Sequence, residues 1–197
     1  MLNIRKCGHK DLERYYGLLE MDFAKEEIIS KLSLHRAMLN GNAELLVVYD
    51  EESALEVAYA VVLTKNVYGY VLLKYMAVLP WYRDKGVGIA AMRLINKRYA
   101  DRQGIIAELT SVDDEDGSMI KSLRKFFARF GYVRIASDYR IGGAPVELMI
   151  KPVKGTYEIE PVEDRIIRDF YTRILNPFAM DKMIDIRPVN KQETELS

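Results

Sequence analysis

The chain has 197 residues, enough for one domain with a sizeable core, and is 49% hydrophobic and 29% charged, as globular proteins commonly are. Lys plus Arg and Asp plus Glu both number 29, and this balance argues against a general nucleic-acid-binding protein. The single cysteine, Cys7, allows no internal disulfide, and the N-terminal sequence lacks a signal-peptide-like apolar region. No apolar run approaches the ~20 residues that cross a bilayer. We therefore expect a cytoplasmic protein with neither a nucleic-acid nor a membrane partner.

The first half of the chain predicts short strands and two amphipathic helices. Apolar residues keep helical spacing from Leu12 to Leu39, and the turn signal Asn40-Gly41-Asn42 ends the second helix. The strands expected in this half cover residues 2–5, 45–49, 55–63 and 70–79. The second and third of these strands are joined by a polar turn and predict a hairpin.

The second half predicts a parallel crossover followed by a C-terminal extension. A helix over 86–102 and a strand over 105–109 should form a right-handed strand–helix–strand unit. A helix over 119–130, closed by Gly131, precedes strands over 132–136 and 146–150. The expected fold class is α/β, with a mixed, mostly antiparallel sheet flanked by helices.

Beyond Pro152 the pattern changes to one long amphipathic helix with a polar tail. We expect residues 1–152 to form the main domain and 153–197 a helical extension. Apolar residues from Val162 to Leu175 keep helical spacing, so this helix needs a surface to pack on. That surface belongs either to its own domain or to a second subunit in a homodimer.

The stretch Arg83-Asp84-Lys85-Gly86-Val87-Gly88 suggests that backbone approaches an anionic ligand at a helix start. A P-loop is excluded because Lys85 precedes the glycines and no hydroxyl residue follows them. A dinucleotide fingerprint fits Gly86 to Ala91 literally, and Glu108 follows at about the ~20 residues that ribose binding requires. The residues from Leu79 to Lys85, however, separate the strand from the first glycine, and the preceding strands read as a hairpin. A dinucleotide-dependent enzyme is therefore the minor alternative.

With the strand MAVLP and a Tyr-Arg pair before it, the Arg-x-x-Gly-x-Gly stretch resembles the acetyl-coenzyme A signature of the GCN5-related N-acetyltransferase (GNAT) superfamily. The element order, the helix ending FFARFGY and the glutamate in AELTS also match that family. The resemblance covers roughly residues 1–152. It implies an acetyltransferase that uses acetyl-CoA as co-substrate.

The resemblance implies two groups of cofactor-binding residues. The end of a strand would pair its backbone with the pantetheine arm, as an added strand does; its residues are Ala77, Val78 and Leu79. The following loop and helix start would hold the pyrophosphate, through Arg83, Asp84, Lys85, Gly86, Val87, Gly88 and Ile89.

For catalysis, Glu108 matches the glutamate that serves as base in part of the family and would take a proton from the acceptor amine. The family's acid is a tyrosine in the pattern Phe-Tyr-x-x-x-Gly-Phe, but this chain has Phe127 at that position. Either another group protonates the thiolate, with Tyr75, Tyr132, Tyr139 or water as candidates, or the thiolate leaves without help.

The sequence thus predicts an N-acetyltransferase that moves acetyl from acetyl-CoA directly to a primary amine. The alternative, motivated by Phe127, is a catalytically weak acyl-CoA-binding or sensory module. His9 and His35 have no ligand partners at metal-binding spacing, so no metal site is expected. An acidic loop over 111–118 either attracts a cationic amine or is simply solvated. The acceptor would be selected near Glu20 to Phe23, Tyr68 and Gly142-Gly143.

Overall fold

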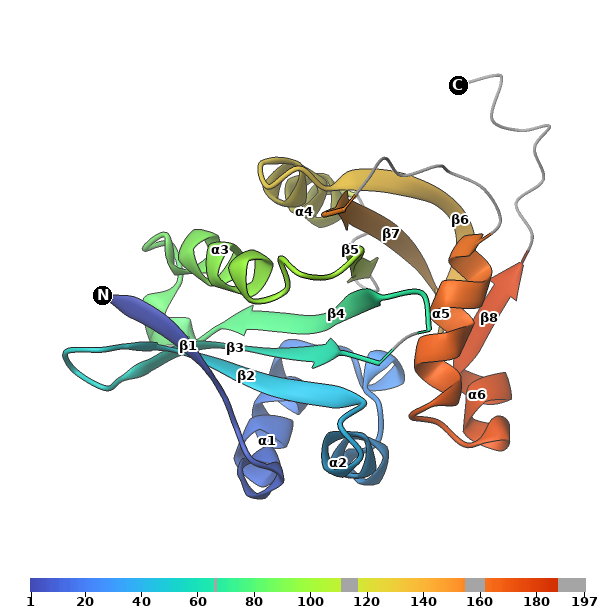
Figure 1. Ribbon diagram of the computed structural model, residues 1–197, viewed down its shortest axis with the longest axis horizontal. Coiled ribbons are helices and arrows are strands. Elements are labelled where there is room, and N and C mark those ends of the chain that lie inside the picture. The colour runs from blue at the N-terminus through green and yellow to red at the C-terminus, as the bar shows by residue number, and fades with distance from the viewer. Residues whose placement is uncertain (66, 111–116, 155–161, 188–197) are drawn as a thin grey trace.

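The computed structural model describes residues 1–65, 67–110, 117–154 and 162–187, whose strands form one mixed sheet (Figure 1). The strands are β1 Leu2–Lys6, β2 Ala43–Asp50, β3 Glu56–Leu63, β4 Tyr70–Val78, β5 Gly104–Thr110, β6 Val133–Ile141, β7 Ala144–Pro152 and β8 Ile184–Arg187. Their order across the sheet is β1-β2-β3-β4-β5-β7-β6-β8. The β4–β5 pair is parallel and the other neighbours are antiparallel. The predicted fold class is confirmed.

Helices cover both faces of the sheet. They are α1 Leu12–Asp22, α2 Lys31–Leu39, α3 Val87–Arg98, α4 Ser118–Ala128, α5 Val162–Thr172 and α6 Pro177–Met183, with 3-10 turns η1 His9–Asp11, η2 Lys25–Glu27 and η3 Pro80–Tyr82. In Figure 1, α3 and α4 lie above the sheet, α1 and α2 below it, and α5 and α6 beside β8. Among the described residues, no helix combines the length and apolarity needed to cross a membrane.

Strand alternation divides the apolar residues between two cores. Leu72 and Ile106 belong to the core on the side of α1, α2 and α5. Their chain neighbours Val71 and Ile105 belong to the core under α3 and α4. Because successive side chains of a strand point to opposite faces, both sides of the central strands are buried. The sheet is therefore the middle layer of the molecule.

Several boundaries differ from the expected ones. The second helix begins at Lys31 because the Ser30 hydroxyl accepts a hydrogen bond from the Ser33 amide and caps it. Helix α3 ends at Arg98, and Tyr99 then turns its hydroxyl toward Glu44 at 2.8 Å. Helix α6 and strand β8 were not predicted, because each is short. The Asn176 side chain accepts from the Ala179 amide, so an Asn-Pro cap was the available signal for α6.

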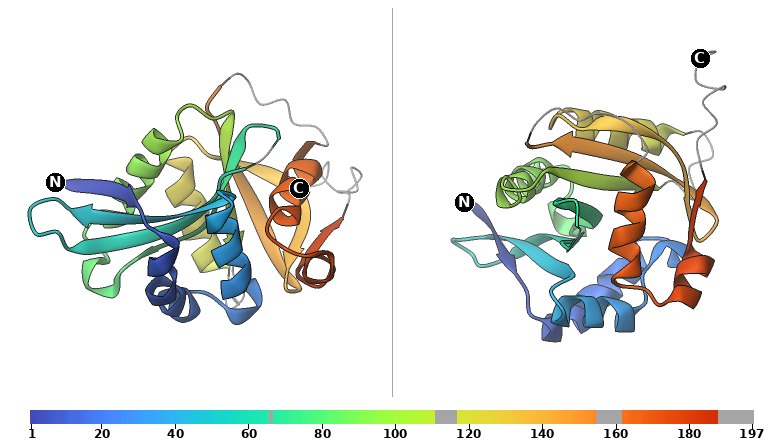
Figure 2. Two further views of the ribbon diagram at one scale, coloured as in Figure 1. Left: turned by 60° about the horizontal axis from the view of Figure 1, so that its bottom comes forward. Right: turned by 45° about the vertical axis from the view of Figure 1, so that its right-hand side comes forward.

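The C-terminal segment packs on the same chain. Helix α5 places four buried side chains in the core that α1 and α2 also form: Ile166, Ile167, Phe170 and Tyr171. Strand β8 continues the sheet by pairing with β6. Figure 2 shows α5 lying alongside the sheet in both further views. The amphipathic helix thus finds its surface within its own chain, and of the two alternatives a homodimer is not needed to cover it.

This packing predicts that α5 contributes to global stability. Phe170→Ala should lower the free energy of unfolding by about 3–5 kcal/mol, because the substitution removes a fully buried aromatic ring. Arg165→Ala, at an exposed position of the same helix, should change it by no more than about 0.5 kcal/mol. Urea denaturation measures both, and equal midpoints would show that α5 is not part of the common core.

Candidate active site

The site is built where β4 and β5 separate. The register between these parallel strands runs from Tyr70 and Gly104 to Leu73 and Ala107, where it ends. Both strands continue, β4 to Val78 and β5 to Thr110. The edge of β4 that faces β5 therefore has no strand partner beyond Leu73 within the described chain. Such an edge offers backbone donors and acceptors to a ligand.

A bulge in β4 lies at the same point. Leu73 pairs with Val62 of β3 and Tyr75 pairs with Val61, so Lys74 is the extra residue. The bulge inverts the alternation of the strand, since Leu73 belongs to the α3–α4 core and Tyr75 to the opposite core. It thereby places Lys74 beside the gap between the strands.

Lys74 forms a buried ion pair with Glu108. The Lys74 Nζ lies 2.7 Å from Glu108 Oε2, and the two side chains are 2% and 1% exposed. The ammonium also lies 5.1 Å from the ring centroid of Tyr75 and 5.7 Å from that of Tyr171. Sequence reasoning missed Lys74, since a lysine in an apolar strand gives no sign of burial.

Two tyrosines complete the surroundings of the Glu108 carboxylate. Tyr139 of β6 donates to Oε1 at 3.0 Å, and Tyr171 of α5 donates to both oxygens at 2.9 Å. Burial and the nearby Glu108 charge raise the pKa of both phenols well above the usual value. The phenols therefore stay protonated and act as donors. Tyr171 comes from the C-terminal extension, and sequence reasoning assigned it only a packing role.

A cavity of about 440 Å³ opens into the gap and includes the ion pair in its lining. Its wall is formed by Asp22, Phe23, Ala24, Glu27, Leu73, Lys74, Met76, Glu108, Leu109, Thr110, Met119, Leu123, Phe126 and Phe127. These residues come from the α1–η2 segment on one face and from α4 on the other, with β4 and β5 between them. The cavity therefore joins the two faces of the sheet through the separated strands.

Carboxylates dominate the polar part of the cavity wall. Glu27 is buried and accepts a hydrogen bond from the Thr110 hydroxyl at 2.5 Å. Asp22 accepts from Tyr59 at 2.8 Å and pairs with Arg83 at 2.8 Å. Among the described residues, Lys74 offsets the charge of Glu108 and Arg83 offsets that of Asp22, so Glu27 leaves the wall with a net negative charge. A cavity of this charge favours a cationic ligand.

The tyrosines considered as proton donors occupy different places. Phe127, at the family's tyrosine position, lines the cavity and packs edge-on against Tyr132 at 5.1 Å between ring centroids. The Tyr132 hydroxyl donates to Asn96 of α3 at 2.9 Å, and Tyr132 is not among the lining residues of the cavity. Tyr75 donates to the Glu27 carbonyl and accepts from the Ile29 amide. Of these candidates, Tyr139 alone contacts Glu108 in the described structure.

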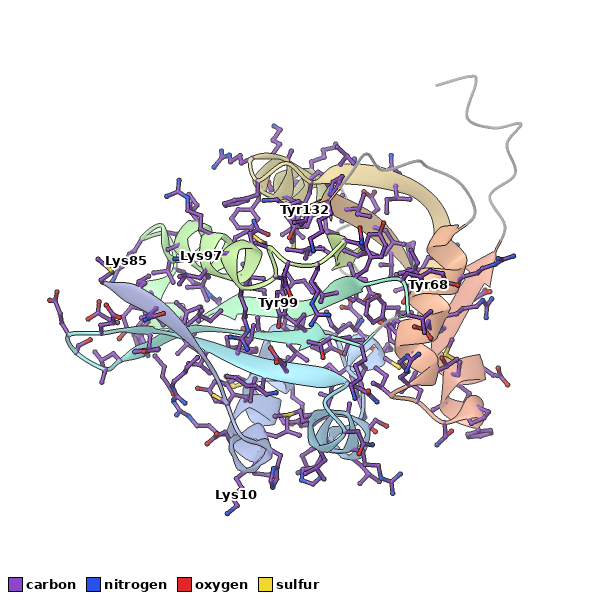
Figure 3. All side chains as sticks on the ribbon, in the orientation of Figure 1. Lys10, Tyr68, Lys85, Lys97, Tyr99 and Tyr132 are labelled. Carbon is purple, nitrogen blue, oxygen red and sulfur yellow. The ribbon has the colours of Figure 1, made fainter. Side chains whose placement is uncertain are left out.

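The glycine loop leads from β4 into α3. Asp84 and Gly86 have positive φ angles, 61° and 75°, and Gly86 precedes the first helical residue, Val87. No side chain caps this helix start and its first turn carries no acidic residue. Helix geometry leaves the first amides without intrahelical acceptors, so they suit an anion. Lys85 lies at this end of α3 in Figure 3.

Arg83 is turned away from the loop amides. Its Nε donates to the Val78 carbonyl at 3.1 Å while its guanidinium pairs with Asp22. Arg83 therefore ties the loop to the end of β4 and to α1. An anion at the loop would be held chiefly by backbone amides.

The remaining expectations fall outside the cavity. Most of the acidic loop, residues 111–116, lies outside the described residues. Among the described residues, no group of three or more potential metal ligands gathers in one place. His9 and His35 pack edge-on at 5.3 Å between ring centroids, and neither lines the cavity.

The mixed sheet that opens between β4 and β5, with a glycine loop leading into α3, is a GNAT-type fold. Comparisons of the chain with known proteins agree. Residues 41–134 match the family model described as an acetyltransferase (GNAT) domain. This match confirms the resemblance to the family that the sequence predicted. No curated protein matches its sequence.

Three solved structures illustrate the shared fold. An acetyltransferase assigned to the GNAT family from Bacteroides thetaiotaomicron is 19% identical with a TM-score of 0.68, over 86% of this chain and 96% of that one. Spermidine/spermine N-acetyltransferase SpeG from Vibrio cholerae is 12% identical, with a TM-score of 0.58 over 77% and 92%. NAA60 from Arabidopsis thaliana, in complex with acetyl-CoA, is 13% identical, with a TM-score of 0.59 over 79% and 100%. At these identities the likeness establishes the fold alone.

The buried ion pair leads to a stability prediction. Lys74→Met should destabilise the protein by about 3–5 kcal/mol, because it leaves the buried Glu108 charge without its partner. The double variant Lys74→Met/Glu108→Gln removes both charges and keeps a carbonyl for the tyrosine hydroxyls, so it should recover most of that loss. Urea unfolding of the two single variants and the double variant measures the coupling, and purely additive effects would contradict a coupled pair.

Proposed function

We propose that the protein is an acetyl-CoA-dependent N-acetyltransferase that transfers acetyl directly to a primary amine. The observation that carries the proposal is the cavity in the gap between β4 and β5, which brings an unpaired strand edge together with an acidic wall. The glycine loop at the end of β4 adds an uncapped helix start.

Acetyl-CoA is proposed to run from the glycine loop along β4. The pyrophosphate would lie on the amides between Arg83 and Ile89, where the helix dipole favours negative charge. The pantetheine amides would pair with the β4 edge at Ala77, Val78 and Leu79, as an added strand does. Its thioester would then lie in the gap near Lys74.

The acceptor is proposed to be a primary amine that enters as a cation. Asp22, Glu27 and Glu108 carry one more charge than their partners Arg83 and Lys74, so the described wall has a net negative charge. The apolar part of the wall includes Phe23, Met119 and Leu123, which would contact the carbon skeleton. The V. cholerae neighbour is described as a spermidine/spermine N-acetyltransferase, a further reason to test polyamines first.

Glu108 is the proposed base. A free alkylammonium has a pKa near ~10.4, so it must lose a proton before its nitrogen can attack the thioester. Glu108 is a lining residue of the cavity, and its carboxylate is held by Lys74, Tyr139 and Tyr171. These hydrogen bonds occupy both carboxylate oxygens, so one of the hydrogen bonds has to break before Glu108 can accept a proton.

The direct test is thiol release from acetyl-CoA with a panel of amines that includes polyamines, amino acids and peptide N-termini. We expect release with at least one amine and a loss of about a hundredfold or more in kcat for Glu108→Gln. An unchanged kcat in this variant would refute the role of Glu108, and no thiol release with any amine would refute the enzyme.

The cofactor path can be tested separately at Gly88. A Cβ at this position would lie 3.6 Å from the Val78 side chain and 3.9 Å from the Phe126 ring, so the free protein can tolerate it. The larger Gly88→Val side chain would project between β4 and α4 and should weaken acetyl-CoA binding at least about tenfold, or ~1.4 kcal/mol. Gly17→Val, at an exposed position of α1, is the control. Calorimetric titration measures both, and equal affinities would place the cofactor elsewhere.

One observation favours a second candidate, an acyl-CoA-binding or sensory module with weak catalysis. Phe127 lines the cavity at the family's tyrosine position and cannot donate a proton. Tight binding of acetyl-CoA without thiol release would select this candidate. A cytoplasmic setting is part of either proposal, since the single cysteine, Cys7, is buried and unpaired.

A further inference from the structure

We propose that Lys74 is the proton donor to the departing thiolate, in the place of the tyrosine that this chain lacks. This inference rests on the proposed acetyl transfer. It assigns a catalytic role to a residue that carries no family signature.

The first support is position. Lys74 is the bulged residue of β4, and it follows Leu73, the last residue paired with β5. A cofactor arm running along β4 from Val78 would reach Lys74 after four residues, roughly 13 Å at about 3.3 Å per residue. Lys74 thus lies at the inner end of the proposed cofactor path.

The second support is the composition of the cavity wall. Lys74 and Phe127 line the same cavity. The proposed donor therefore lies at the cavity that a tyrosine at position 127 would also line. Among the described lining residues, Lys74 is the one cationic group, and the Thr110 hydroxyl already donates to Glu27. An ammonium has three protons, and the hydrogen bond to Glu108 uses one of them.

The third support is the means of recharging the donor. The amine nitrogen attacks the thioester carbonyl, the C–S bond breaks, and its electron pair stays on sulfur. Lys74 gives a proton to that thiolate and becomes a neutral amine. Glu108, 2.7 Å away, passes on a proton taken from the acceptor and restores the ammonium. An acceptor that enters as RNH₃⁺ loses two protons, of which one ends on coenzyme A and the other in solvent.

Tyr139 and Tyr171 are positioning residues in this scheme. Their hydroxyls hold the Glu108 carboxylate toward Lys74 from β6 and α5. The titratable groups around the ammonium are therefore Glu108, these two phenols, Tyr75 on β4 and Glu27 on η2. Burial raises the pKa of all three phenols well above the usual value, so they stay protonated beside the ammonium.

The test is Lys74→Arg, which keeps the positive charge beside Glu108 but replaces the donor by a group that does not deprotonate. We expect kcat to fall by about a hundredfold or more while the KM for acetyl-CoA changes less than about threefold. A lowered kcat beside a nearly unchanged KM separates the loss of a proton donor from the loss of a cofactor contact. Lys125→Arg, on the exposed side of α4, is the matched control.

A kcat within about threefold of the native value in Lys74→Arg overturns the proposal, since charge alone would then suffice. If this variant does not fold, Lys74→Met/Glu108→Gln replaces it, and a native-like kcat there has the same meaning. Absence of thiol release by the native protein with every amine overturns the acetyl transfer itself together with the donor. Turnover by the native protein thus distinguishes a failure of the donor role of Lys74 from a failure of the proposed acetyl transfer.

A rescue experiment adds a positive outcome. Phe127→Tyr in the Lys74→Arg background returns a phenol to the same cavity. We expect it to recover at least about tenfold of the lost kcat, because general acid catalysis contributes roughly a hundredfold to ten-thousandfold.

Discussion

The separation of two parallel strands in the middle of the sheet is the constraint on which the site depends. Strands that part expose backbone groups, and buried unpaired groups are costly. Both strands keep an outer partner, because β3 continues along β4 to Val78 and β7 continues along β5 to Thr110. The sheet can therefore open at its centre without losing either strand, and the gap receives the cavity.

The buried ion pair is a second consequence of this gap. Lys74 and Glu108 are the first residues of β4 and β5 beyond the last paired position, so the separated strands bring them face to face. A buried pair contributes little to stability unless its remaining hydrogen-bonding groups are satisfied. Tyr139 and Tyr171 satisfy the carboxylate. The C-terminal helix thus reaches the centre of the site, which makes the extension part of the same structural unit.

The features that depend on local chemistry could be predicted from the sequence. The glycine loop was recognisable because Gly86 adopts a positive φ, and because glycines at a helix start let a ligand come close to the backbone. The central strands were recognisable from their apolar runs. Lys74 was not, since its burial depends on a bulge that a run such as YVLLKYMAV does not encode locally. Tyr171 was not either, because a tyrosine on an amphipathic helix predicts packing, and its contact with Glu108 spans 63 positions of the chain.

Phe127 and Lys74 have to be interpreted together. A phenylalanine at the family's tyrosine position, considered alone, predicts a site that has lost its proton donor. The cavity gives it a different meaning, because Lys74, the bulged residue of β4, belongs to the lining of the same cavity. A proton donor is defined by its distance from the leaving group and not by the helix that carries it. In the proposed scheme, a proton donor lost at one position of the wall is replaced by a donor at another position of the same cavity. A departure from a family motif at a single position therefore does not by itself imply a loss of activity.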